Sequence, residues 1–228
     1  MKSSSTTFSQ KAIAFFSNLK IPKRLPGNVE ILNPYNNSET KDIVDKFYSN
    51  FFNDVNERTF VLGINPGRFG GGVTGIAFTD PIALEKHCGI KNNLSKKPEL
   101  SSKYIYSFID KFGGTKSFYS RFFISALFPL ALIKDEKNYN YYDSSETYKY
   151  LKPYLISSLK EQINFGAKKD SIICLGKKNS KYLNELNKKL AFFKNIITLE
   201  HPRYIMQYRL KKKDYYIKKY IDAFNSCF

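Results

Sequence analysis

Cysteine is scarce in this chain. Its three cysteines, Cys88, Cys174 and Cys227, lie far apart among 228 residues, and no two of them form a C-x-x-C pair. Zinc sites and iron–sulfur clusters need closely spaced thiolates, and disulfide frameworks need several pairs. We therefore expect no metal, cluster or other cofactor.

Long apolar runs are missing as well. No stretch approaches the roughly 18 apolar residues that a membrane-spanning helix needs. The opening stretch, MKSSSTTFSQKAIAFF, lacks the continuous apolar region and the small-residue cleavage site of a secretory signal. We expect a cytoplasmic protein without a membrane segment.

Acidic residues are few relative to basic ones. The 20 Asp and Glu stand against 37 Lys and Arg, which leaves a net charge of +17. A Lys-rich genome would raise the lysine count without any function, but it would not explain why the acidic residues do not keep pace. An excess this large favours a polyanionic partner through long-range attraction and counterion release. Nucleic acid is the partner that it favours, with an anionic membrane surface as the alternative.

What the chain does have is a clear alternation of apolar patterns. The predicted helices, which carry apolar residues at helical spacing, are 39–52, 103–114, 154–166, 181–193 and 215–224. Pro153 fits the first turn of the third helix. The predicted strands, which are short continuous apolar runs, are 59–64, 121–128, 171–176 and 195–200.

Strands that are apolar on both faces and alternate with helices are typical of a covered parallel sheet. The sequence predicts an α/β fold with three layers, α/β/α, around a central parallel sheet of about four strands. No repeat or linker divides residues 1–228, so we expect one domain, with about 1–28 as an appended N-terminal helix. Ligands of such sheets bind at the carboxyl ends of the strands.

The glycine-rich stretch after the first predicted strand raises one alternative. GGGVTG, residues 70–75, formally matches the dinucleotide fingerprint G-x-G-x-x-G. That fingerprint should open a helix directly after its strand, and an acidic residue should end the next strand. Here five residues intervene and no such acidic residue follows. A nucleotide-binding oxidoreductase therefore remains only a minor alternative.

Two motifs carry a more specific signal. GINPGRFGGGVTGIAF, residues 63–78, and His201-Pro202 after the last strand resemble the active-site motifs of the uracil-DNA glycosylase superfamily. The first motif fits the pattern G-M-N-P-G-x-F-G-x-x-x-T-G-x-x-F of the single-strand-selective monofunctional branch, with Ile for Met. FFISALFPLAL, residues 122–132, is similar to the second strand of the family. The resemblance follows the family's order over roughly 30–210.

The resemblance implies two catalytic residues. Breaking an N-glycosidic bond builds negative charge on the leaving base, so catalysis requires stabilising that charge and placing a water near the sugar carbon. By resemblance, Asn65 orients the water and His201 donates a hydrogen bond to a base carbonyl. Each also has a structural interpretation, Asn65 as a loop-ordering residue before a proline and His201 as a buried histidine.

The same resemblance implies a base-binding pocket. Phe78 matches the aromatic residue that stacks on the flipped base, although a core phenylalanine is the alternative. Gly67 and Gly71 would bring backbone amides to the base edge. Gly71 replaces a bulkier residue of better-known relatives, which predicts a wider pocket there.

The second strand departs from the family. Ala126 stands where relatives often carry an asparagine that reads the uracil edge. Either a bulge lets the adjacent Ser125 replace that amide, or backbone groups read the base. This departure predicts tolerance of other deaminated or oxidised bases.

The stretch after His201 predicts contact with DNA. Arg203, Tyr204 and Ile205 are candidates to fill the gap left by a flipped base. Arg209, Lys211 and Lys212 lie in a basic stretch with interleaved tyrosines, which suits phosphate contact and base stacking. A solvated lysine-rich helix face is the alternative for 214–224.

These inferences together predict a monofunctional DNA glycosylase that flips and hydrolytically excises uracil in base excision repair, as a monomer acting on single- or double-stranded DNA. No lysine occupies a catalytic position of either motif, so we expect no Schiff-base lyase step. The alternative from another class is a non-catalytic nucleic-acid-binding module on the same fold.

Overall fold

The computed structural model describes residues 6–228. The expectation for about 1–28 therefore falls in part on residues 1–5, which lie outside the described residues. Within the described part, α1 (Phe8–Ser17) is a helix that begins with a capping box between Thr7 and Gln10.

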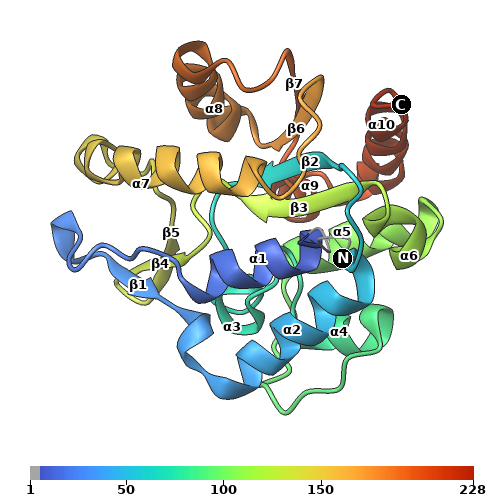
Figure 1. Cartoon of the computed structure of the whole chain (residues 1–228), viewed down its shortest axis with the longest axis horizontal. Helices are drawn as coiled ribbons and strands as arrows, with labels where there is room; N and C mark the ends of the chain where they lie inside the picture. Colours follow the sequence, from blue (N-terminus) through green and yellow to red (C-terminus); the bar gives the residue numbers. More distant parts are fainter. Residues whose placement is uncertain (1–5) are drawn as a thin grey trace, which may run out of the picture.

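A parallel sheet of four strands lies at the centre of the fold (Figure 1). Its strands are β2 (Thr59–Gly63), β3 (Phe122–Ala126), β6 (Ser171–Leu175) and β7 (Asn195–Leu199). They pair in the order β3-β2-β6-β7, and every pairing is parallel. The predicted strands are therefore confirmed, each ending one or two residues before the apolar run does.

Helices cover both faces of this sheet, as predicted for three layers. On one face, the Phe8 ring of α1 contacts Phe60 and Phe123, with ring centroids 6.1 and 5.0 Å away. On the other face, Phe122 packs against Phe112 and Phe224 at 5.7 and 4.7 Å. Because neighbouring strand residues point to opposite faces, Phe122 and Phe123 bury their rings in different layers.

The longer helices match the predicted ones in place, with shifts at their ends. They are α2 (Ser38–Phe52), α5 (Leu100–Lys111), α7 (Ser145–Ile163), α8 (Lys177–Leu190) and α10 (Lys213–Asn225). Shorter helices also form: α3 (Gly71–Thr74), α4 (Pro81–Cys88), α6 (Gly114–Tyr119), α9 (Pro202–Tyr208), η1 (Pro26–Asn28), η2 (Pro34–Asn36) and η3 (Leu210–Lys212).

The placement of Pro153 in a first helical turn is wrong. Helix α7 begins at Ser145, where the hydroxyl of Ser144 accepts from the Thr147 N–H over 3.0 Å, and Pro153 lies in its interior. The ring sits on the exposed face, where water can satisfy the carbonyl that loses its helical partner. The helix therefore continues through the proline.

A second, antiparallel sheet was not predicted. It consists of β1 (Glu30–Leu32), β4 (Ala131–Lys134) and β5 (Lys137–Tyr139), with β4 in the middle. Pairing of β1 with β4 joins segments about a hundred residues apart in sequence. This sheet carries the chain after β5 to the edge of the central sheet, where the site lies.

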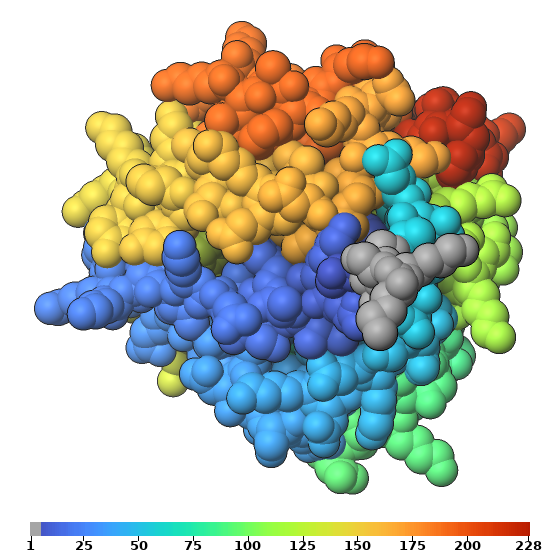
Figure 2. All heavy atoms as spheres, viewed as in Figure 1, coloured from blue at the N-terminus to red at the C-terminus, as the bar shows by residue number. Residues whose placement is uncertain are grey.

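Helix α1 lies at the surface of the molecule and buries its aromatic side chains in the core. In Figure 2 the blue band that holds α1 lies between the yellow and orange α7 segment and the lighter blue α2 segment. Phe8, Phe15 and Phe16 of α1 are all buried. Helix α1 thus packs on the core, in line with the expectation for this region.

Candidate active site

Asn65 lies two residues after β2, at the carboxyl edge of the central sheet. Its Nδ2 donates to the carbonyl of Tyr139 over 2.9 Å, and its Oδ1 accepts from the backbone N–H of Tyr141 over 3.2 Å. These two bonds define which amide atom is oxygen and hold the group in one orientation. One hydrogen and one lone pair remain for a water or a substrate.

His201 lies at the same edge, two residues after β7, and it caps α9. Its Nδ1 accepts from the backbone N–H of Arg203 over 3.2 Å. Nδ1 therefore carries no proton, and the neutral ring has its proton on Nε2. Burial, together with the nearby charge of Arg203, lowers the pKa of His201 to about 4. At neutral pH this side chain is an uncharged hydrogen-bond donor.

Phe78 supplies an aromatic wall beside His201. Its φ of 54° is in the left-handed region that non-glycine residues rarely adopt. The ring rests on Gly63, where any Cβ would collide with it, and its centroid lies 5.6 Å from that of the His201 ring. The strained backbone thus places a flat apolar surface next to the neutral donor.

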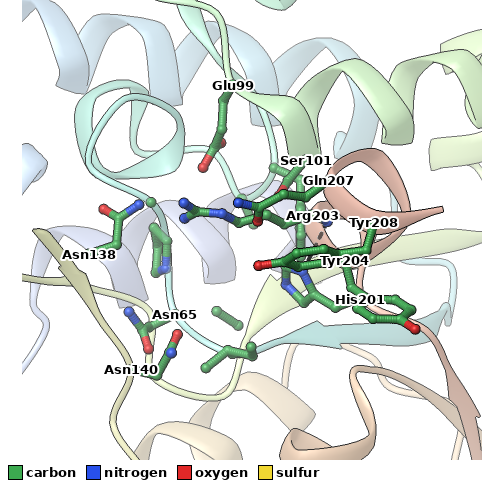
Figure 3. A pocket seen from close by; sticks show the side chains of 16 residues that line it. Asn65, Glu99, Ser101, Asn138, Asn140, His201, Arg203, Tyr204, Gln207 and Tyr208 are labelled. Carbon is green, nitrogen blue, oxygen red and sulfur yellow. Dashed lines mark hydrogen bonds between the residues drawn. The ribbon is translucent and has the colours of Figure 1, made fainter. Parts of the chain in front are cut away.

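These residues line one cavity of about 480 Å³ (Figure 3). Among the residues expected from the sequence, Asn65, Gly67, Phe78, His201, Arg203 and Tyr204 line it. They come from the ends of β2 and β7 and from α9, so parallel strand ends bring the two motifs together.

Three expected residues lie elsewhere. Gly71 is buried within its own loop, where a Cβ would meet the Ile76 carbonyl oxygen at 2.8 Å, and it does not line the cavity. Ser125 is buried in β3, which has no bulge in its pairing with β2, so Ala126 faces the cavity instead. Ile205 is fully buried on the inner face of α9. None of these three residues lines the cavity, so their base-binding and DNA-inserting roles stay predictions that this arrangement does not favour.

The burial of Ile205 follows from the helix after His201. Pro202 occupies the first turn of α9, and the helix continues to Tyr208. On this helix Arg203 and Tyr204 face outward and toward the cavity, whereas Ile205 and Met206 pack inward.

Several lining residues carry no signal in the sequence motifs. They are Glu99, Ser101, Asn138, Asn140 and Gln207, whereas Tyr208 is one of the interleaved tyrosines expected to contact DNA. Asn138 and Asn140 belong to the antiparallel β5 and its end, which the apolar periodicity did not reveal. Glu99 comes from a polar loop, where no sequence pattern distinguishes it from a solvated residue.

Glu99 has an unusual environment for a carboxyl group. Its two oxygens rest against Gly67 and Gly70, where a Cβ on either glycine would collide with them. Burial, and to a lesser extent the neighbouring Asp80 carboxylate, raise the pKa of Glu99 to about 7 against the opposing charge of Arg203. The group is therefore partly protonated near neutral pH.

The basic residues beyond α9 form an exposed surface next to the cavity. Arg209, Lys211 and Lys212 are solvent-exposed, and Tyr208 is 62% exposed. The Arg209 guanidinium lies 5.4 Å from the centre of the Tyr204 ring. Positive charge and aromatic faces thus meet at the rim of the cavity.

Further along the chain, α10 fits in part the interpretation as a DNA-contacting helix and in part that as a solvated helix with aromatic residues packed inward. Ile217, Tyr220 and Phe224 are buried, whereas Tyr215 is 63% exposed.

Within residues 6–228, no cluster of side chains suited to a metal ion occurs. None of the described helices is both long and apolar enough to cross a membrane.

Two comparisons with known proteins match most of the chain. The family model described as the uracil DNA glycosylase superfamily matches residues 49–225. The crystal structure of wild-type Pedobacter heparinus SMUG2 superposes with a TM-score of 0.93 at 42% sequence identity. The superposition covers 97% of this chain and 98% of that one. A comparison with curated proteins gives no match.

Proposed function

Because this chain belongs to the uracil-DNA glycosylase superfamily, we propose that it excises uracil from DNA. Its sequence motifs indicate a likeness to the single-strand-selective monofunctional branch of that superfamily. Family membership implies an N-glycosidic hydrolase that acts on DNA. The finer proposal is that the enzyme flips uracil into the 480 Å³ cavity and cleaves its bond to the sugar without a lyase step. The observation that carries it is the presence of a clamped amide, Asn65, and a neutral donor, His201, on one cavity.

The chemistry follows from these two groups. As the C1′–N1 bond breaks, its electron pair goes to the base, and charge accumulates on the uracil carbonyl O2. A hydrogen bond from Nε2 of His201 stabilises that charge. A neutral donor suits this role because it needs no proton transfer. The water held by Asn65 adds its oxygen to C1′, and its proton leaves to solvent or to the departing uracil anion.

Two other surfaces support substrate binding. The Phe78 ring offers a face on which the flipped base can stack, which stabilises any base by roughly 1–3 kcal/mol. Arg203 and Tyr204 at the rim, with Arg209, Lys211 and Lys212 beyond them, suit the phosphates and bases of the bound strand. Ala126 leaves the apolar side of the cavity open to other deaminated or oxidised bases.

The two alternative functions are less well supported. A non-catalytic binding module would not need an amide held by two backbone bonds beside a neutral histidine. An oxidoreductase would need its glycine loop open to a phosphate, but Gly71 and Gly72 are buried against neighbouring backbone and side chains. A cytoplasmic location, a monomeric state and a single domain stay predictions.

The test is excision from a uracil-containing oligonucleotide, scored as alkali-labile abasic sites. The wild-type protein should cut, and Asn65→Ala and His201→Ala should each lower the rate about 100- to 1000-fold with most DNA binding retained. His87→Ala is the matched control, because His87 contacts Asp110 on α5 and does not line the cavity. A wild-type protein that binds DNA but leaves no abasic site, over a panel of deaminated bases, would refute the proposal.

A further inference from the structure

The side chain that reads the polar edge of the base has not yet been identified. The base edge of uracil away from the sugar presents a donor, N3–H, next to an acceptor, O4. A side chain that presents one donor and one acceptor side by side matches this pair, as an amide does. Ala126, where such an amide was expected, has no polar side-chain atom and lines the cavity with a methyl group.

The asparagines of the cavity are each held by other groups of the protein. Asn138 accepts from the Arg68 N–H on its Oδ1 over 3.0 Å, and Asn140 directs its Nδ2 at both carboxylate oxygens of Asp143, over 3.2 and 3.0 Å. To pair with a base edge, each of these amides would have to share an atom that already makes a hydrogen bond. Asn65 has one bond on each amide atom already.

The geometry points to Glu99: we propose that its carboxyl group contacts the polar edge of the flipped base and, as a neutral acid, presents the donor and acceptor of the missing amide. This inference rests on the proposed function. The protonated group has one O–H donor and one carbonyl acceptor on neighbouring atoms, the same pair as an amide. The O–H would donate to O4, and the carbonyl oxygen would accept from N3–H.

The backbone of Glu99 is held in place by the Asp80 carboxyl group. The backbone N–H of Glu99 donates to Oδ2 of Asp80 over 2.8 Å, while Oδ1 of Asp80 accepts from the Ala83 N–H at the start of α4 over 2.8 Å. The Asp80 carboxyl group is thereby held beside Glu99, and its charge opposes ionisation of the Glu99 carboxyl group, which faces the cavity.

Charges on the other side act in the opposite direction. The side chain of Arg203 extends across the cavity near Glu99 (Figure 3), and its charge favours the ionised carboxylate. Glu99 also lines an adjoining cavity of about 440 Å³, and the basic residues Arg68 and Lys137 line the same cavity. The pKa of His201, the other group of the cavity with a shifted value, lies at about 4. Glu99 is thus the group of this site expected to change charge near pH 7.

Gln207 is the remaining amide at the cavity. It lies on α9 and is solvent-exposed, whereas Glu99 is half-buried against the glycine loop. An enclosed side chain exchanges fewer hydrogen bonds with water than an exposed one, so it is better suited to pair with a buried base edge. Glu99 is the better-placed reader.

The experiment measures kcat/KM for uracil excision by wild type, Glu99→Gln and Glu99→Ala between about pH 6 and pH 8. Over this range, a group of pKa near 7 changes its protonated fraction about tenfold. Wild-type kcat/KM should fall about tenfold as the pH rises. Glu99→Gln should retain most activity with a flat profile, because an amide keeps both groups at every pH. Glu99→Ala should lose about 10- to 100-fold throughout, as expected for an unpaired polar edge.

Controls separate this role from a structural one. Glu85→Gln removes an exposed carboxylate of α4 that pairs with Lys96 at 2.6 Å, and it should leave the wild-type pH profile unchanged. Thermal unfolding of each variant shows whether it is folded. A Glu99→Gln variant as inactive as Glu99→Ala, or one with the wild-type pH dependence, would overturn the assignment.

A second readout does not depend on excision. Affinity for an oligonucleotide with one non-cleavable 2′-fluoro-2′-deoxyuridine, measured by fluorescence anisotropy, should weaken for wild type at the higher pH and stay constant for Glu99→Gln. If wild type excises nothing, the proposed function fails, and this measurement still decides whether Glu99 reads the base. Equal affinities of wild type, Glu99→Gln and Glu99→Ala would refute the role of Glu99 alone.

Discussion

Asn65 shows how a single side chain depends on distant backbone. Its amide is held by Tyr139 and Tyr141, more than seventy residues later in the chain. A donor must face the Tyr139 carbonyl, because two facing oxygen atoms would repel each other and leave that carbonyl unpaired. The residue type at position 65 is thus determined by its backbone partners as well as by the water it would orient.

Asn65→Asp should therefore damage both stability and excision. The carboxylate would place an oxygen against the Tyr139 carbonyl, and we expect a loss of about 1–3 kcal/mol in the free energy of unfolding at neutral pH, recovered in part once the acid protonates. Urea unfolding at neutral and acidic pH measures this, and single-turnover excision should fall at least about tenfold. Asn53→Asp, at the exposed end of α2, is the matched control. A fully stable and active Asn65→Asp would contradict the donor requirement.

The segment after β5 is the element that joins the two sheets at the site. The hydroxyl of Tyr141 donates to Oδ1 of Asn179 in α8 over 2.8 Å. Nδ2 of Asn179 in turn donates to the carbonyls of Leu62 and Leu175, over 3.3 and 3.4 Å. Asn65 is thereby tied, through the Tyr141 backbone, to the ends of β2 and β6.

Tyr141→Phe tests this connection. It removes the hydroxyl and leaves Oδ1 of the buried Asn179 without its partner, which should cost about 1–3 kcal/mol of stability. Because the Tyr141 N–H also holds Asn65, we expect kcat to fall several-fold with KM nearly unchanged. Tyr142→Phe is the control on the neighbouring buried tyrosine. A destabilised Tyr141→Phe with wild-type kcat would show that the connection is structural only.

Among the secondary-structure elements, the central strands could be predicted from the sequence, whereas α9 and β5 could not. The strands of the central sheet were predicted because they are apolar on both faces, and the ends of β2 and β7 carried the recognisable motifs. Helix α9 was missed because its seven residues are too short for a periodic pattern and follow a proline. The antiparallel β5 was missed because KNY carries no apolar alternation, and its pairing with β4 decides its structure.

For the whole molecule, the net charge of +17 gives a long-range attraction to DNA that the site residues alone do not supply. Part of that charge lies beside the cavity, on Arg209, Lys211 and Lys212. Binding should therefore weaken steeply as salt rises, since each phosphate contact releases counterions.

Replacing Lys211 and Lys212 together by alanine should lower the slope of log affinity against log salt by about 1–2, measured over roughly 50 to 200 mM salt. The matched control, Lys41→Ala with Lys46→Ala, removes the same charge from the exposed side of α2. Equal slopes for the two double variants would place the DNA elsewhere on the surface.

The sequence by itself determined the layered α/β fold, the central strands and the pair Asn65 and His201, because each of these follows from local patterning or from a short motif. Only the tertiary structure decided that Ser125 and Ile205 point into the core, since the strand register and a short helix set their directions. It alone brought Glu99 to the cavity, because a residue from a polar loop reaches the site only when the glycine turn at 67–70 and Asp80 close around it.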